Sequence, residues 1–167
     1  MTLLVLTLVL TFAGYFVQSR NTVGPAPKWK QIRLMRSTRT EVEKLLGRSK
    51  YRGYFASYKV DGGLLRIEYY PFNSCGQSGA DFRVRRWTVV EITYEPDDPP
   101  MQADLNLDLK KLRKVAVTGD VLGVISYVND EDGVDYMFHD ETLNNMRYFP
   151  GKRYDYLRCK NSTENRR

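Results

Sequence analysis

Histidine and cysteine are scarce in this chain, whose 167 residues include one histidine and two cysteines. A serine or cysteine triad needs a histidine as its general base, so His139 is the only residue that could serve. His139 ends a predicted strand, in MFHDET, and stands beside Asp140 and Glu141. This position is typical of a surface histidine, and we do not predict a triad.

Two other short motifs resemble known sites only superficially. CGQSGA at 75–80 contains the serine of a nucleophile elbow, but Ala80 replaces the second glycine and no strand-to-helix context surrounds it. VNDEDG at 128–133 contains the glycine of a calcium loop, but Val128 and His139 occupy its first and twelfth positions. We therefore predict no catalytic residue, no metal site and no cofactor.

Two carboxylates on predicted strands, Glu68 and Glu91, are the remaining candidates for acid–base chemistry. Arg66 shares a predicted face with Glu68, and Glu95 shares one with Glu91. Charge pairing on a solvent-exposed face is the ordinary reason for such residues. A hydrolase that uses Glu68, Glu91 or His139 remains a less favoured alternative.

Charge is absent from residues 2–17, TLLVLTLVLTFAGYFV. The run is shorter than the about 20 apolar residues of a membrane span, and Val17-Gln18-Ser19 fits cleavage before Arg20. No basic residue precedes it, so an uncleaved anchor and a buried core helix are alternatives. We predict a signal peptide at 1–19, a Gly/Pro-rich linker at 20–28, and an extracytoplasmic protein that is periplasmic or secreted. Membrane association would follow only if the leader is retained.

The two cysteines, Cys75 and Cys159, form an even count, which favours a disulfide in an exported protein. The bridge would close a loop of 159 − 75 = 84 residues, which the chain-entropy model values at about 4–5 kcal/mol. It would tether the basic tail at 151–167. Two unrelated thiols are the alternative.

The segment STRTEVEKLLG at 37–47 predicts a short helix with both ends specified. Thr38 suits the N-cap, Glu41 completes a capping box, and Gly47 suits the C-terminal stop. A helix this short is marginal alone, so its apolar face must pack on a sheet. That face consists of Val42, Leu45 and Leu46.

Strand patterns follow this helix, and the order of elements occurs twice. YFASYKV and LLRIEYY flank the turn at 61–63, RWTVVEITYEP alternates like a half-buried strand, and the prolines of EPDDPP at 95–100 end it. LDLKKLRKV at 107–115 then predicts a helix, GVISYV and GVDYMFH a hairpin, and TLNNMRYFP a third strand. We predict an α+β fold of tandem helix-β-β-β units at 29–96 and 104–150, with an antiparallel sheet covered by short helices.

The opening LMRSTRTEVEKLLGRSKYRGYFASYKVDGGLLRIEYY resembles that of the BamE/SmpA-like and β-lactamase-inhibitor-protein-like α+β repeat domains. There a helix of pattern G-x-[ST]-x-x-[DE]-V-x-x-x-[LF]-G-x-P precedes antiparallel strands. The residues that fit this pattern are Thr38, Glu41, Val42, Leu46 and Gly47. Arg36 replaces its glycine, Ser49 replaces its proline, and the lipid-anchoring cysteine of the BamE lipoproteins is absent. The chain is also similar to exported bacterial proteins of unknown function with an STRxxVExLLG motif. These resemblances imply an exported interaction domain and transfer no catalytic residue.

Tyrosine is abundant, with 12 copies, and the net charge is +6. Because Tyr and Trp dominate interface energetics, we predict a non-catalytic binding module of the cell envelope with a protein partner. The candidate anchors are Tyr54, Tyr58, Tyr69, Tyr70 and Tyr94. The alternative partner is an anionic envelope polymer or glycan, since basic and aromatic residues interleave in KWKQIRLMR and RVRRW. The candidate anion-binding residues are Arg83, Arg85, Arg86 and Trp87. We do not predict nucleic acid, because exported proteins rarely meet it.

Overall fold

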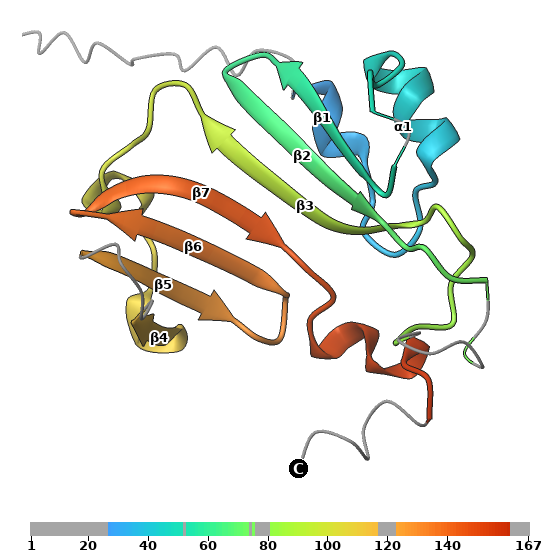
Figure 1. Cartoon of the computed structure of the whole chain (residues 1–167). Helices are drawn as coiled ribbons and strands as arrows, with labels where there is room; N and C mark the ends of the chain where they lie inside the picture. The colour runs from blue at the N-terminus through green and yellow to red at the C-terminus, as the bar shows by residue number, and fades with distance from the viewer. Residues whose placement is uncertain (1–26, 52, 74, 76–80, 117–122, 161–167) are drawn as a thin grey trace, which may run out of the picture.

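One antiparallel sheet forms the body of the protein in a computed structural model that describes residues 27–160 except 52, 74, 76–80 and 117–122 (Figure 1). The predicted leader at 1–19 lies outside the described residues. The strands are β1 (Phe55–Val60), β2 (Gly63–Tyr69), β3 (Val89–Pro96), β4 (Arg113–Ala116), β5 (Val124–Asn129), β6 (Val134–His139) and β7 (Thr142–Tyr148). The helices are η1 (Lys28–Gln31), α1 (Arg39–Leu46), η2 (Gln102–Leu105), η3 (Leu109–Lys111) and η4 (Lys152–Leu157).

The strand order is β1-β2-β3-β7-β6-β5-β4, so two meanders meet at their third strands, β3 and β7. Only three residue pairs form this junction, which we call the seam. They are Ile92↔Tyr148, Thr93↔Arg147 and Tyr94↔Met146. The meanders therefore share one sheet rather than forming separate units.

The predicted fold class is wrong, because the second unit does not begin with an α-helix. The segment predicted as a helix at 107–115 contains the single 3₁₀ turn η3, and the chain then enters strand β4. Asp108 makes no side-chain capping hydrogen bond at its start, so nothing offsets the cost of helix nucleation. The described chain is accordingly β-rich, with one seven-stranded sheet in place of tandem helix-β-β-β units.

The predicted first helix is present as α1, and its capping box is confirmed. The backbone N–H of Thr38 donates to Glu41 Oε2 at 2.7 Å, and the backbone N–H of Glu41 donates to Thr38 Oγ1 at 3.5 Å. Val42 is 1% exposed and places α1 on the sheet. Gly47 ends the helix with a φ angle of 89°, which glycine adopts without steric cost.

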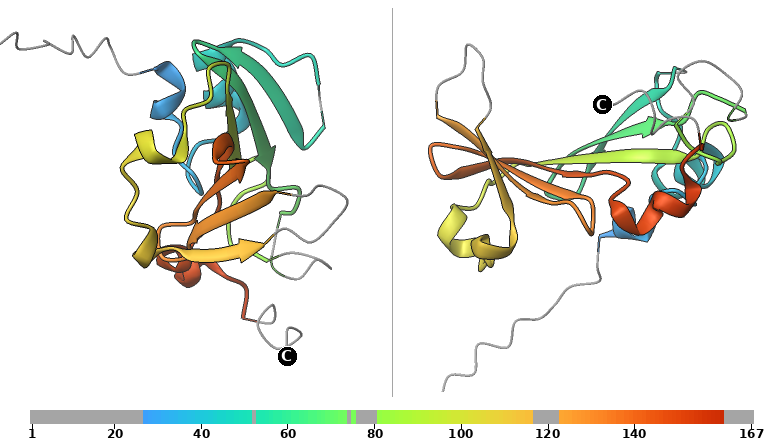
Figure 2. Two further views of the ribbon diagram at one scale, coloured as in Figure 1. Left: turned by 90° about the vertical axis from the view of Figure 1, so that its left-hand side faces the viewer. Right: turned by 90° about the horizontal axis from the view of Figure 1, so that it is seen from below.

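The core lies on one face of the β1–β3 half, beneath η1, the segment after it and α1. Leu65, Ile67 and Ile92 point into this core from the strands. We call the other side of the sheet the open face; it faces the viewer in Figure 1. The edge-on view in Figure 2 shows α1, η1 and η4 gathered at one end of the sheet.

The predicted disulfide between Cys75 and Cys159 is present, which is consistent with an extracytoplasmic protein. The tail is held by more than this bond. The backbone N–H of Cys159 donates to Asp81 O at 2.9 Å, and that of Arg83 donates to Leu157 O at 2.7 Å. The tail is therefore folded against residues 81–83 of the loop after β2 as far as Cys159. None of the helices within the described ranges is long and apolar enough to cross a membrane.

Trp29→Ala should lower the free energy of unfolding by about 3–5 kcal/mol, the usual cost of removing a buried aromatic side chain. Trp29 is 7% exposed, stacks on Tyr94 at 5.0 Å and lies 6.5 Å from the Tyr148 ring, so it covers the seam. Urea unfolding measures the change. Trp29→Phe keeps a ring and loses an N–H that has no hydrogen-bond partner in the described chain; it should cost clearly less. Equal losses in both variants would contradict this account.

The double variant Cys75→Ser/Cys159→Ser should be less stable by about 2–5 kcal/mol, because a long loop is no longer closed in the unfolded state. Reductant should destabilise the wild-type protein by a similar amount and leave the double variant unchanged. Urea unfolding with and without reductant tests both statements. Both statements are refuted if reductant does not change the free energy of unfolding of the wild-type protein.

Candidate functional site

Three of the five predicted interface tyrosines lie in the core. Tyr58, Tyr69 and Tyr70 are 6%, 0% and 3% exposed. Tyr58 and Tyr69 point to the covered face, where their hydroxyl oxygens lie 3.4 Å apart, and burial raises the pKa of both. Tyr70 accepts a hydrogen bond from the backbone N–H of Phe82 at 2.9 Å. These three residues are structural and are not exposed anchors.

Tyr94 and Tyr54 are more accessible but have different surroundings. Tyr94 stacks on Trp29, and its hydroxyl donates to Gly62 O at 2.7 Å, so it belongs to the cover of the seam. Tyr54 is 36% exposed and stacks on Trp87 with ring centroids 5.1 Å apart. Tyr54 alone keeps the role of an exposed candidate anchor.

The predicted anion-binding segment divides into two parts. Arg86 and Trp87 join Tyr54: the Arg86 guanidinium lies 4.9 Å from the Trp87 ring and donates to the Tyr54 hydroxyl at 2.9 Å. Arg83 and Arg85 instead line a hollow with Arg36 and η4. The four residues therefore do not form one site.

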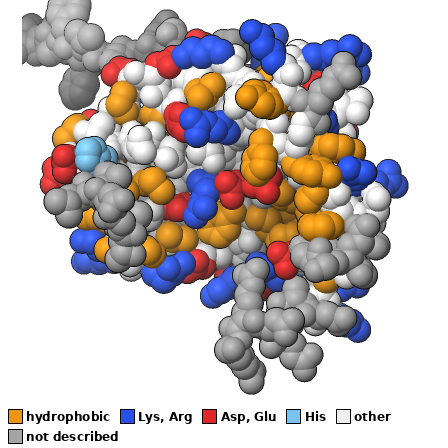
Figure 3. All heavy atoms as spheres, in the orientation of Figure 1, with side chains coloured by type: hydrophobic (Ala, Val, Ile, Leu, Met, Phe, Trp, Pro, Cys, Tyr) orange, Lys and Arg blue, Asp and Glu red, His pale blue; other side chains and the backbone are white. Residues whose placement is uncertain are grey.

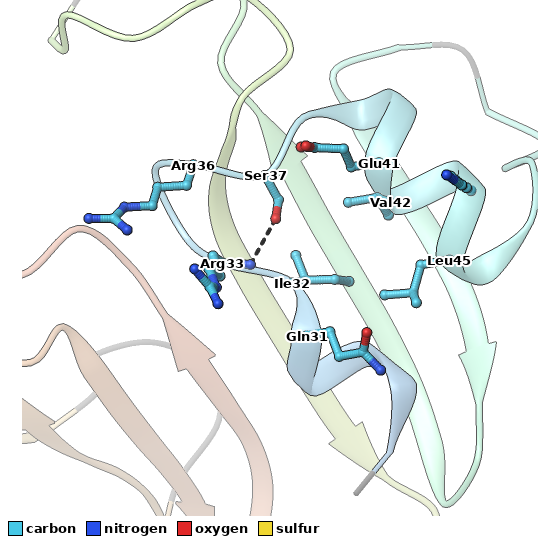
Figure 4. A pocket seen from close by; sticks show the side chains of 9 residues that line it. Gln31, Ile32, Arg33, Arg36, Ser37, Glu41, Val42 and Leu45 are labelled. Atoms are coloured by element: carbon cyan, nitrogen blue, oxygen red, sulfur yellow. Dashed lines mark hydrogen bonds between the residues drawn. The ribbon is translucent and has the colours of Figure 1, made fainter.

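A basic surface, which we call the Arg36 surface, brings Arg83 and Arg85 together with the residues of KWKQIRLMR. Three adjoining hollows meet at Arg36. The first, of about 520 Å³, lies between the η1 segment and α1 and has Ile32, Val42 and Leu45 on its walls (Figure 4). The second, of about 490 Å³, extends to β3, β7 and η4, and the third, of about 520 Å³, lies between residues 83–85 and η4. The cations that line them are Lys30, Arg33, Arg36, Lys44, Arg83, Arg85 and Arg153.

Backbone pairing holds the parts of this surface in place. The N–H of Met35 donates to Val89 O, and the N–H of Val89 donates to Ser37 O, both at 2.8 Å. Met35 and Trp87 have φ angles of 59° and 69°, which are uncommon for bulky residues and concentrate at functional sites. Two segments that are 52 to 54 residues apart in the sequence thus meet in a strained junction beside Arg36.

Most of the charge of the Arg36 surface is uncompensated, although Arg153 pairs with Asp132 at 3.5 Å. Glu41 is the only acidic residue among the described residues that line the hollows. Hydrogen bonds from the Thr38 N–H and hydroxyl already engage it and lower its pKa. Within the described ranges, Arg33, Arg36 and Lys44 form no ion pair. Such a surface raises the local concentration of anions.

A second charged cluster lies on the open face, where Glu68 of β2 stands directly opposite Glu91 of β3. Burial raises the pKa of both glutamates, and the charge of Glu91 raises that of Glu68 further. Arg147 donates to Asp135 Oδ2 at 3.0 Å and lies 4.0 Å from Glu91 Oε2. The hydrolase alternative gains nothing from this cluster, because His139 pairs with other positions of the sheet. No group of His, Cys, Asp or Glu side chains in the described chain could hold a metal ion.

No family model, curated protein or solved structure matches this chain. The resemblance to BamE-like domains therefore stays a prediction.

Glu68→Gln should raise the free energy of unfolding at neutral pH. A folded-state pKa above the ordinary 4.5 means that the folded state loses stability as the pH rises through that raised pKa. The glutamine variant lacks this loss, so its advantage should shrink at pH values below 4.5. Urea unfolding across this pH range measures it.

Glu95→Gln is the matched control. Glu95 lies on the same open face of β3, but its charge is paired with Arg66 at 3.2 Å. It should not gain stability at neutral pH. An equal gain in both variants would assign the effect to net charge instead of to the Glu68–Glu91 contact.

Proposed function

We propose that this protein is a non-catalytic extracytoplasmic binding module that holds an anionic polymer of the cell envelope on the Arg36 surface. The observation that carries the proposal is the meeting of three hollows at Arg36, lined by seven cations and one hydrogen-bonded carboxylate. The disulfide between Cys75 and Cys159 supports a location outside the cytoplasm.

The arrangement favours a polymer over a single small anion. The first and second hollows share Ile32 and Arg33, and the second and third share Tyr154. Cations therefore follow one another along a connected path, as in grooves that track a charged backbone. Apolar side chains such as Ile32 and Tyr154 give the path contact area beside the charges.

A protein partner is the second candidate, and one observation favours it. Tyr51 is 74% exposed and shortly precedes Tyr54, which is 36% exposed and stacks on Trp87 before the start of edge strand β1. Exposed aromatic residues next to Arg86 have the composition of an interface hot spot. This surface is separate from the Arg36 surface, so both partners could bind one molecule.

The double variant Arg33→Ala/Arg36→Ala should weaken binding of polyphosphate, used as a probe, by about tenfold or more at low salt. The slope of log K against log salt should fall by about 0.7–0.9 for each lost contact, because fewer counterions are released. Isothermal titration calorimetry of the oxidised protein at several salt concentrations measures both quantities.

Lys110→Ala/Lys114→Ala is the matched control, because it removes the same charge from exposed residues of η3 and β4. It should leave the affinity nearly unchanged. Equal losses of affinity in the two double variants would refute a specific site. A wild-type affinity that does not change with salt concentration would refute the polyanion proposal itself.

A further inference from the structure

Arg147 on the open face shows how this sheet holds a guanidinium group. Its Nη2 donates to Asp135 Oδ2 at 3.0 Å, and its Nη1 lies 4.0 Å from Glu91 Oε2. Its guanidinium carbon lies 5.5 Å from the centre of the Phe149 ring. Two carboxylates and one aromatic ring thus surround one arginine, which combines one charge-assisted hydrogen bond, one ion pair and one cation–π contact.

A second set of two carboxylates and one aromatic ring, which shares Glu91, lies on the other side of Glu91 and holds no cation of the described chain. Glu68 stands opposite Glu91, and Phe55 of β1 stands opposite Glu68. Residues directly opposite one another in an antiparallel ladder share a face and lie close together. Phe55 is 65% exposed. We call Phe55, Glu68 and Glu91 the vacant half of the cluster.

Among the described residues, no cation pairs with Glu68. Arg66, two positions away on β2, is engaged with Glu95 at 3.2 Å. No basic residue lowers the pKa of Glu68, whereas burial and Glu91 raise it. Glu68 and Glu91 therefore face each other as like charges, which destabilises the folded state.

The whole cluster carries more negative charge than Arg147 neutralises. Asp135 is 3% exposed, and its Oδ1 has no hydrogen-bond partner in the described chain. A buried carboxylate oxygen without a partner is costly, and Asp135 lies on β6 on the far side of Arg147 from the vacant half. Figure 3 shows acidic and basic side chains side by side in the middle of the open face, bordered by hydrophobic ones.

We propose that Phe55, Glu68 and Glu91 form a binding site for an arginine side chain of a partner protein. Guanidinium fits better than ammonium, because its planar fork can donate to two carboxylates while its face contacts a ring. Arg147 already lies between two carboxylates and one aromatic ring on the other side of Glu91. The site lies across the sheet from the Arg36 surface and does not depend on it.

The test is a titration of the oxidised protein with N-acetyl-arginine amide, followed by NMR of the side-chain carboxyl carbons. We expect saturable shifts at Glu68 and Glu91, and a Kd several-fold higher for N-acetyl-lysine amide. Glu68→Gln should raise the Kd for the arginine compound about tenfold, the usual scale for one lost charge-assisted contact. Binding should weaken as the pH falls and the two glutamates are protonated.

Three variants separate the site from trivial causes. Glu95→Gln removes the same charge from the same face and should leave the Kd unchanged. Phe55→Ala should weaken binding, and Phe55→Tyr should preserve it, because only the ring face is used. Arg33→Ala/Arg36→Ala should have no effect, which keeps this result distinct from the polyanion test.

The proposal is overturned if the carboxyl signals of Glu68 and Glu91 do not shift saturably. It is also overturned if the arginine and lysine compounds bind equally, or if Glu95→Gln weakens binding as much as Glu68→Gln does. Misfolding does not confound the comparison, because Glu68→Gln is expected to be the more stable protein at neutral pH.

Discussion

The seam between β3 and β7 is the connection on which the rest of the structure depends, because three residue pairs alone join the two meanders there. A ladder this short needs support from both faces of the sheet. On the covered face, Trp29 packs across Tyr94 and Tyr148. On the open face, Arg147 of β7 reaches Glu91 of β3. The side chains that support the seam therefore also form part of the two charged surfaces.

The pleat of the sheet explains why these surfaces have opposite charge. Successive residues of a strand point to opposite faces, so Ile92 enters the core while Glu91 lies on the open face. The basic residues come from segments that cross the covered face, and the acidic ones come from the strands themselves. One layer of backbone thus separates a surface suited to anions from a surface suited to a cation.

Local signals in the sequence were reliable where a few adjacent residues determine the structure. The capping box of Thr38 and Glu41 and the Cys75–Cys159 pair occur as predicted, and so does the hairpin turn, although Gly63 belongs to β2 and the turn is confined to residues 61–62. The second helix failed because residues 109–111 form only the 3₁₀ turn η3, and residues 113–116 then pair with β5 as strand β4. The tyrosines failed for a different reason: alternation shows that a strand has two faces but not which face a helix covers. The Arg36 surface required contacts such as Thr38↔Thr88, which no local pattern encodes.

The disulfide fastens η4 beside Arg83, and η4 supplies Tyr154 and Arg153 to the hollows around Arg36. Redox state and binding of the proposed anion would therefore be thermodynamically linked through one helical segment. Linkage is reciprocal. If reduction loosens η4 and lowers the affinity for the anion, the bound anion makes the disulfide harder to reduce by the same factor. An occupied molecule would thus resist reductants that open an empty one, and the bond would report on whether the protein holds its ligand.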